Sequence, residues 1–253
     1  MAKFLRTFRI TMLKENKMKR YFVYAFGEIL LVVIGILIAL WVNQVNLSYQ
    51  NSKKEIVILS EIRENLITDT LKISQISQFH KSKKKEIYNT LKIISDNEPS
   101  DANRETLLQY FTNGDIFQIK EFNSNSVGYS NLINSGNIEI LKERKIKNLL
   151  TQYYLTTSKN IGALDVAKNN TRQFKDYIIP KTINNWSLKK LTGLEFELEN
   201  QNFIVGLNND AIAISSLLQM SIQIDFSENI LLAIKEDIKQ LIKLIDIKIK
   251  ESE

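Results

Sequence analysis

The sequence contains no cysteine, and His80 is its single histidine. The absence of cysteine excludes disulfide bonds, thiol catalysis and a lipid-modified cysteine anchor. One histidine without any cysteine cannot build a transition-metal site of the usual kind. The sequence also lacks a glycine-rich phosphate loop, a Gly-x-Ser-x-Gly elbow and a His-Glu-x-x-His motif. We therefore predict that the protein is not an enzyme and binds no metal and no cofactor.

Helix-breaking residues are scarce, with eight glycines and two prolines in 253 residues. Neither type occurs between Ile36 and Glu98, so nothing forces a helix to stop there. Apolar positions in this stretch repeat with the spacing of three and four residues that is typical of an amphipathic helix. We place the possible bend of this long helix in the polar residues 43–52. The predicted core-facing stripe consists of Leu59, Ile62, Leu66, Asp69, Ile73, Ile76, His80, Lys83, Ile87, Leu91 and Ile94.

The rest of the chain is also predicted to be helical. The further expected helices cover, in order, residues 101–112, 125–134, 138–179 and 201–250. Gly136 suits a left-handed cap after the second of them, and Pro180 closes the third. We expect residues 181–199 to be irregular, since the strand-like alternation of residues 195–199 has no partner strand. The fold class is therefore all-α: one N-terminal transmembrane helix followed by an extracytoplasmic antiparallel bundle of three long and two short helices.

Long hydrophobic runs are limited to one, at residues 22–42, and it is long enough to span a membrane as a helix. We divide the chain into a basic cytoplasmic tail (1–20), a transmembrane helix (21–43) and an extracytoplasmic helical domain (44–253). Residues 1–42 carry seven basic and two acidic residues, whereas the remainder carries 27 and 26. The positive excess before the span predicts an uncleaved signal anchor in the inner membrane, with a cytoplasmic N-terminus and a periplasmic domain. Because the exported part is nearly neutral, we expect no nucleic-acid partner.

The membrane segment resembles a known family. The strings Tyr24-Ala25-Phe26-Gly27-Glu28-Ile29 and Val32-Val33-Ile34-Gly35-Ile36-Leu37-Ile38-Ala39-Leu40 are similar to a domain-of-unknown-function family of single-pass membrane proteins from Bacteroidetes-type bacteria. Two later pieces are similar as well: Tyr129-x-x-Leu132-x-x-Ser135-Gly136-Asn137 and Gln152-Tyr153-Tyr154. The Ile-Asn-Asn-Trp-Asn-like stretch usual after the span is replaced here by Trp41-Val42-Asn43-Gln44-Val45-Asn46. The resemblance implies an inner-membrane anchor and a helical exported domain, and it implies no activity.

Glu28 is the one carboxylate inside the apolar run, and burying a charge in a membrane is costly. Three interpretations remain open: the side chain reaches toward the interface, it takes part in helix association, or it belongs to an ion or proton path. Gly35 and Ala39 form a small-x-x-x-small pair that permits close helix approach. The candidate association face consists of Tyr24, Glu28, Leu31, Gly35, Ile38 and Ala39, with Val42.

Beyond the membrane segment, candidate functional residues are few. Tyr129, Tyr153 and Tyr154 are either ligand-lining or core tyrosines. His80 is expected to be a half-buried histidine beside the lysine-rich residues 81–85. These lysines are expected to be a solvated surface, and the alternative is contact with an anionic lipid or polymer. Glu195, Glu197 and Glu199 would share one side of an extended segment, but nothing orients them for acid–base catalysis.

Three candidate functions are compared with these observations. The first is a non-enzymatic, membrane-tethered helical domain that binds a protein partner in the cell envelope or self-associates through its membrane helix, with the lipid bilayer as its other partner. The second is a small-ligand sensor that acts through a partner protein, because the short tail carries no signalling domain. The third, an enzyme, lacks any supporting motif.

Overall fold

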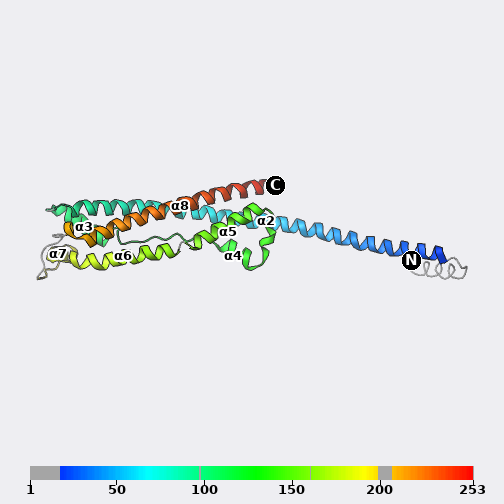
Figure 1. The fold of residues 1–253 in the computed structure, drawn as a ribbon, viewed down its shortest axis with the longest axis horizontal. Helices are drawn as coiled ribbons and strands as arrows, with labels where there is room; N and C mark the ends of the chain where they lie inside the picture. Colours follow the sequence, from blue (N-terminus) through cyan, green and yellow to red (C-terminus); the bar gives the residue numbers. More distant parts are fainter. Residues whose placement is uncertain (1–17, 97, 160, 199–206, 253) are drawn as a thin grey trace. The chain divides into compact units, whose positions relative to one another are not determined.

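The computed structural model describes residues 18–96, 98–159, 161–198 and 207–252, and it is all-α over these ranges (Figure 1). This confirms the predicted fold class of one long apolar N-terminal helix followed by a helical bundle. Residues 1–17 of the predicted basic tail and the predicted helix start at residue 201 lie outside the described residues. The chain divides into two compact units, Met1–Glu55 and Ile56–Glu253.

The longest element is helix α2, Met18–Ile94. Residues 43–52, where we placed a possible bend, are helical throughout, as expected for a stretch without glycine or proline. Helix α3, Asp101–Thr112, has the predicted bounds and begins at the N-cap Ser100, whose side chain accepts a hydrogen bond from the N–H of Asn103. The remaining elements are α4 (Val127–Asn134), η1 (Asn137–Ile140), α5 (Arg144–Lys159), α6 (Ile161–Thr182), α7 (Asn185–Thr192), η2 (Leu207–Asn209) and α8 (Ala211–Lys250).

Some sequence-based boundaries were wrong. The predicted helix 138–179 becomes α-helical only from Arg144, after the short η1, and Pro180 lies inside the last turn of α6 instead of ending it. Residues 181–199 were predicted to be irregular, but they contain α7. This helix is fixed by a capping box, in which Asn184 accepts from the N–H of Ser187 and the Ser187 hydroxyl accepts from the N–H of Asn184. Gly136 has a φ of 68°, which confirms the predicted left-handed cap.

Within the unit Ile56–Glu253, α8 packs along α5 and α6 (Figure 1). Side-chain pairs join it to α2 as well. As residue number rises along α2, the partner's number falls along α8, so the two helices are antiparallel. The pairs are Arg63–Asp246 (2.6 Å), His80–Glu228 (2.5 Å) and Lys84–Asp225 (2.5 Å).

The bundle has two apolar clusters that succeed one another along α2 and α8. The first includes Ile76 of α2, Leu150 of α5 and Leu231 of α8. The second includes Ile87 of α2, Phe174 of α6 and Ile224 of α8. The residues that lie between the clusters, around His80 and Glu228, are mostly polar.

Candidate functional site

Asp69 of α2 is a fully buried carboxylate in the unit Ile56–Glu253. Its two oxygens each accept from the backbone N–H of Asn125 at 2.9 Å. Tyr153 Oη donates to Oδ2 at 2.8 Å, and Lys72 Nζ donates to Oδ1 at 3.1 Å. A buried charge is tolerated when it is paired and its lone pairs are satisfied, and Asp69 meets both conditions.

The three candidate tyrosines gather beside this carboxylate. Tyr154 Oη donates to the carbonyl of Asn125 at 3.2 Å. The ring of Tyr129 on α4 stacks on that of Tyr154, with centroids 4.3 Å apart, and its hydroxyl donates to Thr151 Oγ1. Tyr153 meets the edge of Tyr154 at 4.8 Å. The structure therefore buries Tyr153 and Tyr154 in the interior around α4 and α5, and it packs the partly buried Tyr129 against them.

The environment holds the phenols of Tyr153 and Tyr154 in their neutral form. Burial, reinforced by the charge of Asp69, raises the pKa of Tyr153 and of Tyr154 well above the ordinary tyrosine range. A phenol with so high a pKa stays protonated at neutral pH. Its O–H therefore serves as a hydrogen-bond donor, and its ring serves as packing surface.

Lys83 of α2 departs from the solvated surface that we predicted for residues 81–85. Its side chain is buried, with 5% of the residue exposed, and Nζ donates to the carbonyl of Gln118 at 2.7 Å. Burial lowers the pKa of Lys83 to about 8, although the nearby charges of Asp115 and Glu86 act in the opposite direction. His80 is also buried, and its Nδ1 lies 2.5 Å from Oε1 of Glu228.

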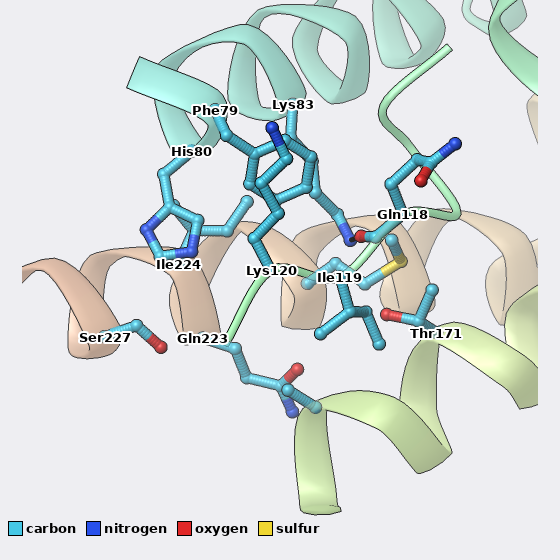
Figure 2. Close-up of a pocket in the computed structure, with 12 residues that line it drawn as sticks. Phe79, His80, Lys83, Gln118, Ile119, Lys120, Thr171, Gln223, Ile224 and Ser227 are labelled. Atoms are coloured by element: carbon cyan, nitrogen blue, oxygen red, sulfur yellow. Dashed lines mark hydrogen bonds between the residues drawn. The ribbon is translucent and has the colours of Figure 1, made fainter. Parts of the chain in front are cut away.

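A small cavity of about 40 Å³ lies beside these two α2 residues, and Met220 and Ile224 of the second apolar cluster also line it (Figure 2). The extended segment before α4, the middle of α6 and the first half of α8 close its other sides. None of the three candidate tyrosines lines it. Its polar lining residues are His80, Lys83, Gln118, Lys120, Thr171, Gln223 and Ser227.

The chain belongs to DUF6090, a family of unknown function, which matches residues 28–177. No curated protein and no solved structure matches the chain. The DUF6090 match covers Asp69, the three tyrosines, Lys83 and Thr171, and it ends before α8. The comparisons therefore assign no activity to either of the two polar clusters, the one around Asp69 and the one around His80 and Lys83.

The predicted association face lies on α2 within the unit Met1–Glu55. Tyr24, Glu28, Leu31, Gly35, Ile38 and Ala39 are all exposed in the structure, as is the whole of residues 29–42. The segment is long and apolar enough to cross a membrane.

Asp69, Lys83 and Thr171 were not singled out from the sequence as functional residues. The available signal was that Asp69, His80 and Lys83 occupy core positions of a stripe that is otherwise apolar. Polar groups at such positions require buried partners. Among the residues that the structure describes, no three His, Asp or Glu side chains converge to hold a metal ion.

Proposed function

We propose that the protein is a membrane-anchored, non-enzymatic helical module that binds a protein partner in the cell envelope through its membrane helix. By resemblance to the single-pass proteins of Bacteroidetes-type bacteria, we take the membrane to be the inner one. The basic residues before the span favour a cytoplasmic N-terminus and a periplasmic domain from about residue 44.

The observation that carries this proposal is the exposed face of α2 at residues 24–39. In a bilayer, apolar side chains on this face are solvated by lipid, but Glu28 gains from a polar partner on another helix. A Cβ added at Gly35 would meet no atom within 4 Å, so the chain itself does not require glycine there. A second helix that packs closely against the Gly35-x-x-x-Ala39 pair supplies a reason for both small residues.

The proposal is tested by cross-linking in native membranes followed by mass spectrometry of the captured proteins. We compare Gly35→Leu and Glu28→Gln with Val33→Leu, which enlarges a side chain by one methylene group on the opposite face of the same helix. We expect both face variants to reduce the cross-linked partner or the cross-linked dimer, while Val33→Leu leaves it unchanged. An identical pattern in all three variants, at equal membrane content, would contradict the proposal.

A second candidate function is a small-ligand sensor that acts through a partner protein. The small cavity beside His80 and Lys83 favours it, because a purely structural bundle has no need of a buried ammonium at such a cavity. The two functions are distinguished by the wild-type cross-linking pattern, which changes with ligand only if the protein is a sensor.

A further inference from the structure

Lys83 carries a buried ammonium group without an ion-pair partner. Among the described residues, no carboxylate oxygen lies within 4.0 Å of its Nζ, and its one hydrogen bond goes to the neutral carbonyl of Gln118. The neighbouring Lys84 behaves differently, since its exposed Nζ reaches both oxygens of Asp225 at 2.5 and 2.7 Å. Buried charges are normally paired in direct contact, whereas Lys83 has spare donors and only the more distant charges of Asp115 and Glu86 to offset its own.

Thr171 of α6 supplies a second unusual group at the same cavity. Only 5% of this residue is exposed, and its hydroxyl makes no hydrogen bond within the described part of the chain. Several helical threonines donate to the carbonyl four residues back, as Thr70 does to Leu66 and Thr112 does to Leu108, although the buried hydroxyl of Thr90 also has no partner. The Thr171 hydroxyl instead points inward toward the other lining residues (Figure 2).

The remaining lining is partly apolar, from Phe79, Ile119, Ala167, Met220 and Ile224, but it carries positive and no negative side chains. Lys120 adds a second ammonium, whose Nζ lies 4.9 Å from the centre of the Phe79 ring. No aspartate or glutamate lines the cavity; Asp115 and Glu86 influence Lys83 from outside it. The volume of about 40 Å³ has room for roughly three water molecules or for one ion of four or five heavy atoms.

We propose that this cavity binds a small oxyanion, of the carboxylate or phosphate class, with Lys83 Nζ and Thr171 Oγ1 as its donors. The anion supplies the charge partner that Lys83 lacks and the acceptor that Thr171 lacks. Charge-assisted hydrogen bonds of this kind are about twice as strong as neutral ones. This inference gives a ligand class to the second candidate function, and its test does not depend on any partner protein.

The test measures thermal unfolding of the full chain in mild detergent during titration with inorganic phosphate and, separately, with acetate. Sodium chloride, whose anion carries no oxygen, keeps the ionic strength constant. A ligand that binds the folded state raises the Tm with its concentration. We expect such a rise with at least one anion, and the comparison of the two anions tells phosphate from carboxylate recognition.

Variants locate the binding. Loss of a charge-assisted bond predicts that Lys83→Met weakens the anion by about 10-fold or more, whereas Thr171→Val weakens it by about 3- to 10-fold. Lys85→Met, at an exposed position of the same helix, is the matched control and should bind as wild type does. If Lys83→Met does not fold, Thr171→Val decides. No rise in wild type with either anion, which means that water alone fills the cavity, overturns the proposal, as does an unchanged rise in both cavity variants.

Discussion

Tyr153 Oη donates a hydrogen bond of 2.8 Å to Asp69 Oδ2, and neither side chain has more than 1% of its surface exposed. This contact joins α5 to α2 and holds a charge inside the bundle. The same carboxylate receives the backbone N–H of Asn125, at the end of the extended segment that leads into α4. One buried carboxylate thus connects α2, α5 and that segment.

We expect Tyr153→Phe to lower the free energy of unfolding by about 1–3 kcal/mol, because it removes a hydrogen bond to a charged group while the ring volume is kept. The measurement is urea unfolding of the chain in mild detergent, followed by circular dichroism. Tyr88→Phe is the control, since Tyr88 is 68% exposed and its loss should change stability by less than about 0.5 kcal/mol. Equal effects of the two variants would show that the bond to Asp69 contributes nothing.

Alkaline pH should destabilise the bundle through the buried tyrosines Tyr153 and Tyr154. Their folded pKa values lie above the ordinary value of 10.0, so their contribution is fully present below about pH 10 and is lost as the pH rises further. Each such tyrosine lowers stability by about 1.4 kcal/mol per pH unit above that point. The free energy of unfolding, measured between about pH 9 and 12, should therefore fall less steeply with pH in Tyr153→Phe than in wild type. Parallel curves for the two proteins would refute this account.

The helical architecture could be predicted because it depends on local features. The absence of glycine and proline between Ile36 and Glu98 leaves α2 uninterrupted, and the bounds of α3 follow from its flanking turns. The helix α7 was missed because its capping box, Asn184 and Ser187, has serine in place of the usual Glu or Gln.

The two polar clusters could be predicted only in part. The stripe placed Asp69, His80 and Lys83 on the core-facing side of α2, but it could not name their partners. Asn125 and Glu228 are 56 and 148 residues away from the side chains they meet, and only tertiary packing brings them there. The cavity itself depends on four separate parts of the chain, so no local pattern reveals it.

Lys83 should make the bundle more stable as the pH rises through the range in which its ammonium loses the proton. Its folded pKa of about 8 lies below the unfolded value of 10.5, so its contribution is present above about pH 10.5 and is lost as the pH falls through about 8. The full effect is no more than about 3 kcal/mol. We expect this rise in stability in wild type and in Lys85→Met, measured by urea unfolding without phosphate or acetate. Its persistence in Lys83→Met would assign it to other groups.

Side-chain pairs of unequal burial join the antiparallel helices α2 and α8. Two acidic residues of α8, one turn apart, pair with α2, but they differ in exposure: Glu228 has 24% of its side chain exposed and Asp225 has 58%. An exposed ion pair contributes little, because solvent screens it, whereas a partner of a buried group is costly to lose. We therefore expect Glu228→Gln to cost about 1–2 kcal/mol of unfolding free energy and Asp225→Asn to cost less than about 0.5 kcal/mol.

Urea unfolding near neutral pH compares these two variants with wild type, and each amide replaces a carboxylate of nearly equal size. If Asp225→Asn cost as much as Glu228→Gln, net charge on α8, and not the buried contact with His80, would explain the loss. A larger effect at Glu228 instead identifies the His80 contact as the one that holds the two helices in register between the apolar clusters, where few apolar side chains are available to do so.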